Sequence, residues 1–288
     1  MLYLCILTSI TTKKKGENMI PKVIHYCWFG GNPLPDNAKK CVATWEKECP
    51  DYEIKEWNES NFDIQSNQYV REAYENKRWA FVSDYVRLVA LTNYGGIYLD
   101  TDVEVLKSLD PLLEQKGFCG FEENEKLCTA ILGCEPEFWV FKEWLDSYEK
   151  RRFILEDGGM DEEPNVFSLT RICKAHGLAM NGQVQNINGF QVFSNDYFSP
   201  KSFVTGETHL TENSYTIHQF SESWRNNREK KMHQRQIRLI QKYGLKRGKF
   251  ISQVLDVPSM FANSVSKRGL SNAIVHACKK ILGKDHRS

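Results

Sequence analysis

The sequence predicts an α/β fold with a mostly parallel central sheet, followed by additional C-terminal helices. Short apolar segments typical of buried strands alternate along the chain with segments of helical periodicity. A long apolar helical segment ends at two consecutive glycines, and the short strand after it ends in two acidic residues. A basic segment with helical periodicity closes the chain.

Each expected element follows from local sequence. Strands read as short runs of β-branched and aromatic residues bounded by Gly, Pro or polar residues. The clearest helix, RWAFVSDYVRLVALTNY, is apolar on most sides and is therefore expected to be buried. Strands are expected over residues 22–29, 52–57, 97–99, 103–106, 119–121, 130–132, 190–193 and 215–220, and helices over 36–49, 78–94, 137–149 and 166–175.

Composition fits one large core with a smaller appendage. The 288 residues are 41% hydrophobic and 26% charged, as in an ordinary globular protein. The nine cysteines show neither a paired framework nor a CxxC spacing, which favours reduced cysteines in a cytoplasmic protein. We expect residues 1–18 to be a non-native N-terminal extension, with Met19 as the natural start, because a strand pattern begins directly after it.

The charge is divided between two segments. Residues 1–224 hold 22 Lys+Arg and 34 Asp+Glu, whereas residues 225–288 hold 16 Lys+Arg and 3 Asp+Glu. We therefore expect a main domain over 19–224 and a basic helical tail over 225–288, with amphipathic helices over 225–243 and 270–282. The lysines and arginines are not regularly interleaved with stacking aromatic residues as in a nucleic-acid-binding surface, so we expect no nucleic acid and instead contact with an anionic membrane surface. A helix pair that packs on the main domain is the alternative.

The residues with the strongest chemical meaning are Asp100 and Asp102, separated only by Thr101 at a strand end. Two such carboxylates can hold Mn²⁺ or Mg²⁺ and leave coordination positions for the oxygens of a diphosphate. A D-x-D pattern alone is weak evidence. Asp84 and Arg87 strengthen it, because they share one face of an apolar helix where charges are costly unless paired. They are either a buried ion pair or ligands of a sugar and its phosphate.

Three residues near the end of the main domain extend this set. His218 follows a strand-like run and offers a neutral imidazole as a third metal ligand, although a lone histidine in such a place is usually structural. Ser223 and Trp224 can donate an O–H and an indole N–H to a diphosphate.

The segments IPKVIHYCWFGG, SDYVRLVALTNYGGIYLDTDV and YFSP…YTIHQFSESW resemble, in the same order, the DXD-containing family-32 glycosyltransferases. That group includes fungal mannosyltransferases and bacterial capsule and lipopolysaccharide enzymes, with clostridial glucosylating toxins as distant relatives. The resemblance covers about residues 20–224 and implies a GT-A type fold. At Pro164-Asn165-Val166 the chain departs from the Gly-Pro dipeptide common in relatives on the acceptor side.

The resemblance implies a role for each matching residue. Asp84, Arg87, Asp100 and Asp102 would be catalytic, Trp28 would stack on the nucleotide base, and Tyr98 would stand beside the metal pair. The metal ligands would be Asp100, Asp102 and His218. The residues implied in donor binding are Trp28, Asp84, Arg87, Tyr98, Asp100, Ser223 and Trp224.

The implied function is that of a retaining hexosyltransferase. It would move a hexose from a UDP- or GDP-linked nucleotide sugar to a glycan or lipid-linked acceptor in capsular polysaccharide or lipopolysaccharide biosynthesis. We expect a cytoplasmic protein, peripheral on the inner face of the plasma membrane. Two alternatives remain: a haloacid-dehalogenase-type phosphatase, whose strand-end D-x-D pair Asp100 and Asp102 also match, and a non-catalytic sugar-binding protein.

Overall fold

The computed structural model describes residues 20–122, 126–221 and 227–268, with side chains up to residue 256. The expected start at Met19, Ser223, Trp224 and the tail after 268 therefore lie outside the described residues. Two compact units are distinguished, one of Met1–Lys201 with His209–Phe220, the other of Ser202–Thr208 with Ser221–Ser288. The expected boundary at residue 225 falls in an undescribed stretch and stays a prediction.

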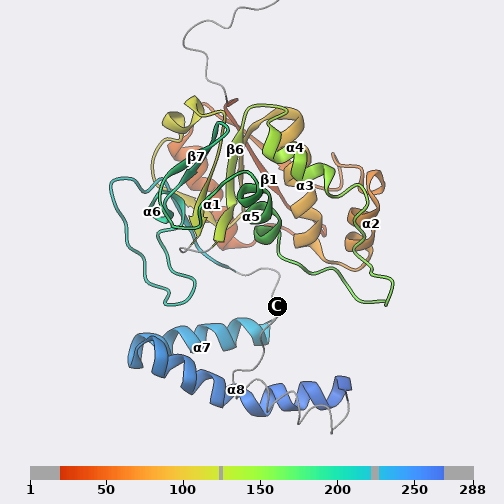
Figure 1. Cartoon of the computed structure of the whole chain (residues 1–288), viewed down its shortest axis with the longest axis vertical. Coiled ribbons are helices and arrows are strands. Elements are labelled where there is room, and N and C mark those ends of the chain that lie inside the picture. The colour runs from red at the N-terminus through yellow and green to blue at the C-terminus, as the bar shows by residue number, and fades with distance from the viewer. Residues whose placement is uncertain (1–19, 123–125, 222–226, 269–288) are drawn as a thin grey trace, which may run out of the picture. The chain divides into compact units, whose positions relative to one another are not determined.

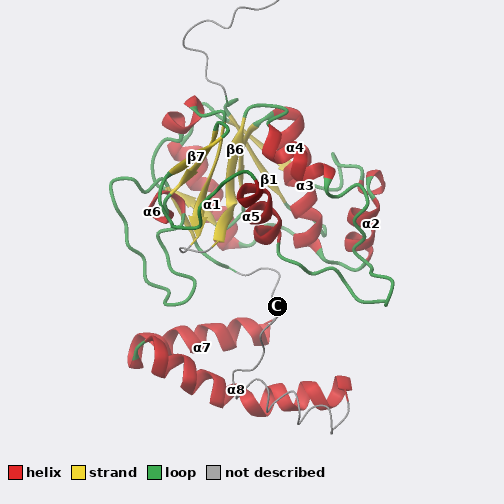
Figure 2. Cartoon of the chain, viewed as in Figure 1, coloured by secondary structure: helices red, strands yellow, loops and turns green. Residues whose placement is uncertain are grey.

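The first unit contains a seven-stranded sheet in the order β2-β1-β3-β6-β5-β8-β7 and a separate pair, β4-β9 (Figures 1 and 2). Its strands are β1 (Val23–Cys27), β2 (Glu53–Trp57), β3 (Gly96–Leu99), β4 (Val103–Val105), β5 (Gly117–Glu122), β6 (Lys126–Cys134), β7 (Gln185–Ile187), β8 (Phe190–Phe193) and β9 (Thr216–His218). Its helices are α1 (Asp36–Glu48), α2 (Gln68–Glu75), α3 (Trp79–Tyr94), α4 (Trp139–Asp146), α5 (Asn165–Ala175) and α6 (Asn195–Phe198), with 3₁₀ turns η1 (Ile64–Ser66) and η2 (Asp110–Glu114).

Strand direction confirms the expected sheet. β1 runs parallel to β2 and β3, β6 is antiparallel to both β3 and β5, and β8 is parallel to β5. Since β6 is antiparallel to both β3 and β5, β5 points in the same direction as β3. Five strands of this sheet therefore point the same way, and β6 and β7 run in the opposite direction. The predicted α/β class, mostly parallel sheet and C-terminal helices are confirmed.

Alternate residues of the strands supply two cores. On one face Ile24, Tyr26, Ile97 and Leu99 pack with α1, α6 and η2, and on the other Cys27 and Tyr98 pack with α2 to α5. This alternation follows from the two-residue period of a strand. It places the Tyr98 side chain on the same face as helix α3, which carries Asp84 and Arg87.

The turn from α3 into β3 needs its two glycines. Gly95 and Gly96 have φ of 64° and 96°, a region that side chains with a Cβ rarely adopt. A Cβ on Gly95 would lie 2.8 Å from the Cys134 carbonyl oxygen, and one on Gly96 would lie 2.7 Å from that of Val23. The two glycines thus end the helix where predicted and bring β3 into register with β1.

The second unit is dominated by α7 (Asn227–Tyr243) and α8 (Leu245–Arg268), which pack on each other. Helix α7 matches the expected segment, but α8 was not predicted, because Gly248 and Pro258 interrupt its sequence pattern. The predicted helix over 270–282 lies outside the described residues. Within the part of the chain that is described, no helix is long and apolar enough to cross a membrane.

Candidate active site

Several of the predicted residues that the structure describes lie at one edge of the sheet. Asp100 directly follows β3 and Trp28 directly follows β1, so both lie at the carboxyl ends of neighbouring parallel strands, where ligands of open α/β sheets bind. His218 ends β9, which pairs antiparallel with β4 so that His218 lies opposite Val103. A residue more than a hundred positions away is thereby brought beside Asp102.

Arg87 links the helix to the strand end. Its Nη2 donates to Oδ1 of Asp84 at 2.8 Å and lies 3.4 Å from Oδ1 of Asp100. Its Nη1 donates to the Thr129 carbonyl oxygen at 2.8 Å, and the guanidinium carbon lies 4.5 Å from the centre of the Tyr98 ring. Asp84 and Arg87 therefore form a buried ion pair, which is one of the two predicted alternatives. Because this pair also contacts Asp100 of the D-x-D motif, it does not exclude the other alternative, that the two residues bind a sugar and its phosphate.

Asp100 receives a second contact from the same strand. The Tyr98 hydroxyl donates to Asp100 Oδ1 at 2.9 Å, and the Tyr98 ring is buried. Burial raises the pKa of the Asp100 carboxyl, an effect that Arg87 opposes and Asp102 strengthens. Asp100 and Asp102 thus form a pair of close like charges that a cation would stabilise.

Asp84 is held from a third element. Asn165, the first residue of α5, donates from Nδ2 to Asp84 Oδ1 at 2.6 Å, and its own Oδ1 accepts from the Thr129 hydroxyl at 2.9 Å. Burial raises the pKa of Asp84 to about 6, while Arg87 acts in the opposite direction. In the sequence, Asn165 stood out only because it departs from a Gly-Pro pattern. No sequence pattern predicted the hydrogen bond from its side-chain amide to Asp84.

His218 completes a set of three metal-ligand atoms. A carboxylate oxygen of Asp100, one of Asp102 and a ring nitrogen of His218 all lie within 4.8 Å of one another. His218 Nε2 is 3.6 Å from Asp102 Oδ1. Burial works against the charged imidazole, but the Asp102 carboxylate raises the pKa of His218 well above its ordinary value. Two carboxylates and one imidazole suit Mn²⁺ or Mg²⁺ and leave positions for further oxygen ligands.

Three further donor-site positions were predicted from the sequence: Trp28, Ser223 and Trp224. Trp28 is half-buried, and its Nε1 donates to the Asn32 carbonyl oxygen at 2.5 Å, which fixes one edge of the indole. Ser223 and Trp224 fall in residues 222–226, which are not described. Glu122, which pairs with His218 at 2.9 Å, was missed by sequence reasoning.

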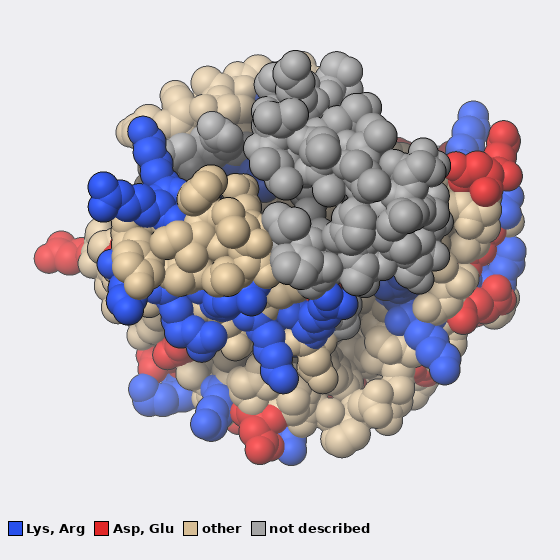
Figure 3. Space-filling view, turned by 90° about the horizontal axis from the view of Figure 1, so that it is seen from below, with Lys and Arg blue, Asp and Glu red and all other residues tan. Residues whose placement is uncertain are grey.

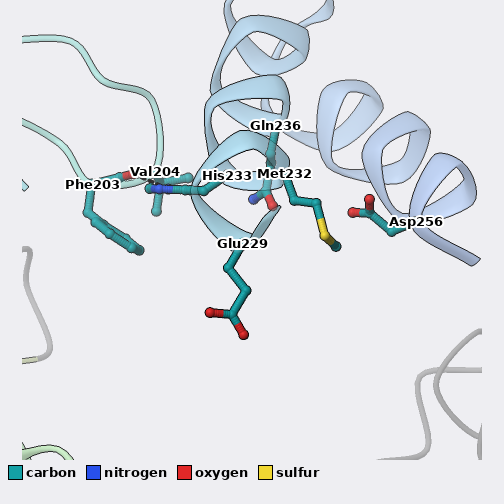
Figure 4. A pocket seen from close by; sticks show the side chains of 7 residues that line it. All are labelled: Phe203, Val204, Glu229, Met232, His233, Gln236 and Asp256. Carbon is teal, nitrogen blue, oxygen red and sulfur yellow. Dashed lines mark hydrogen bonds between the residues drawn. The ribbon is translucent and has the colours of Figure 1, made fainter. Parts of the chain in front are cut away.

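The second unit has an open depression of its own. It measures about 390 Å³ and is lined by Phe203, Val204, Glu229, Met232, His233, Gln236 and Asp256 (Figure 4). His233 Nε2 lies 3.0 Å from the Phe203 carbonyl oxygen, and the two rings lie 4.2 Å apart. These contacts fasten residues 202–208 to α7, so the depression reflects packing inside this unit.

One segment of the chain matches a known protein family. Residues 35–119 match the family model of a glycosyltransferase sugar-binding region containing a DXD motif. This range includes Asp84, Arg87, Tyr98 and the D-x-D pair, but neither Trp28 nor His218. The resemblance seen in the sequence is therefore confirmed at the level of DXD glycosyltransferases.

Two curated relatives are similar to part of this chain. Glucan organizing enzyme 1 of Cryptococcus neoformans var. grubii is 33% identical over 110 residues, 35% of this chain and 29% of that protein. Inositol phosphoceramide mannosyltransferase 3 of Schizosaccharomyces pombe is 37% identical over 126 residues, 40% of this chain and 33% of that protein. The chain thus spans about a third of the length of these two relatives.

Among solved structures, galactosyltransferase LgtC in complex with donor and acceptor sugar analogs is 14% identical, with a TM-score of 0.37 over 81% of this chain and 95% of that one. The family match and the relatives support a glycosyltransferase, rather than the phosphatase with which the chain shares only a strand-end D-x-D pair.

Proposed function

We propose that this chain is a retaining, metal-dependent glycosyltransferase of the GT-A type, which moves a hexose from a UDP- or GDP-linked donor to a glycan or lipid-linked saccharide. The observation that carries the proposal is the convergence of Asp100, Asp102 and His218 within 4.8 Å, with Arg87 beside them. A cation held by the D-x-D motif and a buried arginine beside it can together bind a diphosphate leaving group.

The metal ligands follow from the contacts on each carboxylate. Because Tyr98 and Arg87 both contact Oδ1 of Asp100, we assign Oδ2 of Asp100 to the metal, together with Asp102 and Nε2 of His218. A bound Mn²⁺ or Mg²⁺ supplies Lewis-acid stabilisation of the charge that develops on the leaving diphosphate.

The chain's own residues orient the donor. Arg87 keeps its positive charge, since Asp100, Tyr98 and Asp84 raise its pKa despite burial, and it is fixed by the Thr129 carbonyl. Asp84, held by Arg87 and Asn165, presents a carboxylate to sugar hydroxyls. Trp28 would stack on the base, and Ser223 and Trp224 would contact the diphosphate. The acceptor hydroxyl attacks from the face that the diphosphate leaves and gives its proton to a diphosphate oxygen, so no enzymatic nucleophile is required.

A donor screen tests the proposal. UDP- and GDP-sugars are incubated with the full chain and Mn²⁺, and release of UDP or GDP is measured. We expect turnover of one donor, reduced about 100-fold or more in Asp102→Asn and unchanged in Asp36→Asn, an exposed carboxylate of α1. Binding of UDP or GDP without turnover, with and without acceptor saccharides, would favour the non-catalytic sugar-binding protein instead.

We also propose that the second unit brings the enzyme to an anionic membrane surface. Large apolar side chains are exposed along residues 243–255, namely Tyr243, Leu245, Phe250, Val254 and Leu255. Lys246, Arg247 and Lys249 lie in the same stretch, and Figure 3 shows Lys and Arg side chains scattered over one face, with Asp and Glu side chains also present on it. Adjacent apolar and basic side chains fit the interface of an anionic bilayer.

Such a contact would give the enzyme access to lipid-linked acceptors. We accordingly propose a cytoplasmic, peripheral location on the inner face of the plasma membrane and a role in capsular polysaccharide or lipopolysaccharide biosynthesis. The support is the basic and apolar stretch itself, together with the family resemblance.

A further inference from the structure

His218 lies between two carboxylates, one on each ring nitrogen. Its Nδ1 is 2.9 Å from Oε1 of Glu122, and its Nε2 is 3.6 Å from Oδ1 of Asp102. The side chains of His218, Glu122 and Asp102 are 16%, 19% and 15% exposed, so water competes little for these contacts. The shorter contact is on the side of the ring that faces away from the D-x-D motif.

Strand geometry sets this arrangement. Glu122 is the last residue of β5, which runs in the same direction as β3, so it lies at the sheet edge where Asp100 lies. The pairing of β9 with β4 brings His218 opposite Val103. Glu122 is thus placed to contact the imidazole through the sheet order rather than through proximity in sequence.

We propose that Glu122 is a positioning residue for the metal site. Its carboxylate accepts the Nδ1–H of His218 and so holds the imidazole in the tautomer whose Nε2 lone pair points toward Asp102 and Asp100. A carboxylate behind a ligating histidine fixes the ring orientation and raises the basicity of the ligand nitrogen. This inference rests on the proposed function, because it concerns the metal site proposed there.

The structure also contains a second group of ligand atoms that would compete with the proposed site for a metal ion. Glu122, Cys128 and His218 offer a carboxylate oxygen, a sulfur and a ring nitrogen within 4.8 Å of one another. A metal bound among these atoms would take Nδ1 and leave Nε2 to carry the proton. By accepting a hydrogen bond from Nδ1–H, Glu122 keeps that nitrogen protonated and directs the metal to the opposite side of the ring.

The experiment reads the tautomer and the metal affinity separately. Long-range ¹H–¹⁵N NMR of the full chain, labelled at histidine nitrogen, is recorded with and without Mg²⁺, and His218→Gln identifies the His218 signals among the seven histidines. Mn²⁺ affinity is measured by calorimetry. We expect Nδ1–H in the Mg²⁺-bound wild type and about 10- to 100-fold weaker Mn²⁺ binding in Glu122→Leu.

Matched variants separate this role from a general structural one. Glu122→Gln keeps an oxygen that can accept Nδ1–H, so it should retain the tautomer and lose only a few-fold in affinity. Glu104→Leu and Glu104→Gln change a carboxylate of β4 that accepts from Gln219, and both should bind Mn²⁺ like the wild type.

The outcomes are distinguishable. If wild-type protein binds no Mn²⁺ or Mg²⁺, the proposed function fails and the inference fails with it. If it binds the metal but Glu122→Leu binds equally well, only the inference is overturned. A wild-type complex with the metal on Nδ1 also overturns it, even if Glu122→Leu does not fold.

Discussion

The guanidinium of Arg87 lies 3.4 Å from the carboxylate of Asp100 while it donates to Asp84 at 2.8 Å. One buried cation therefore joins the helix that ends at Gly95 to the strand that carries the D-x-D motif. Because both partners are acidic, Arg87 holds the site together before any ligand arrives, and its removal should affect folding as well as chemistry.

Arg87→Ala should lower the free energy of unfolding by about 3–5 kcal/mol, since it leaves the buried Asp84 without its cation. Urea unfolding measures this loss. Replacing both members, as in Asp84→Asn with Arg87→Met, should recover part of the stability but none of the donor turnover. Equal stability of wild type and Arg87→Ala would contradict the ion pair.

Metal binding should stabilise the folded chain through the D-x-D site. Mn²⁺ at 100 times its dissociation constant should add about 2.7 kcal/mol to the free energy of unfolding, because only the folded state brings the three ligands together. Thermal unfolding with EDTA and with Mn²⁺ measures the effect. Asp102→Asn should lose most of the shift, and Asp36→Asn should keep it.

Asn165→Asp should create a pH-dependent weakness. It places a second carboxylate at the position from which Asn165 donates to Asp84 at 2.6 Å, so the folded protein must hold a proton between the two. A carboxyl pKa that is raised in the folded state favours folding at low pH, so the stability deficit should grow as pH rises through and above 6. Urea unfolding at pH 5 and pH 8 measures it, and a deficit equal at both values would argue against the contact.

His25 should make the protein less stable in mild acid. Its Nε2 donates to the Gly95 carbonyl oxygen and its Nδ1 accepts from Trp57 Nε1, so the folded protein holds it neutral. Burial lowers its pKa to about 4, whereas the unfolded chain takes up this proton near pH 6.5. The free energy of unfolding should therefore fall as pH decreases from 6.5 toward 4, by about 3 kcal/mol in total. In His25→Gln this part of the slope should be absent, as urea unfolding across that range would reveal.

The second unit should bind anionic vesicles. Removing two charges, in Lys246→Ser with Lys249→Ser, should weaken partitioning onto phosphatidylglycerol vesicles about 30-fold, at about 1 kcal/mol per charge. Co-sedimentation measures this. Lys39→Ser with Lys142→Ser removes the same charge from exposed positions of the first unit and should pellet like the wild type. Identical pelleting of the two double variants would exclude the proposed contact.

The sequence by itself determined the elements whose signals are local. The apolar run before Gly95-Gly96 predicted α3 and its end, and the D-x-D pair was predicted to follow directly on a short strand. Spacing along one helix also predicted that Asp84 and Arg87 share a face. These inferences held because hydrophobic period, glycine conformation and helical spacing act over a few residues.

Only the tertiary structure decided which distant side chains join them. Glu122 and Asn165 reach His218 and Asp84 because β5 lies in the same direction as β3 and because α5 begins beside β6, neither of which is encoded in a nearby residue. Helix α8 was missed for a related reason, since Gly248 and Pro258 weaken its local pattern and packing against α7 supplies the rest. Contacts between residues far apart in the chain depend on strand order, which local sequence patterns do not specify.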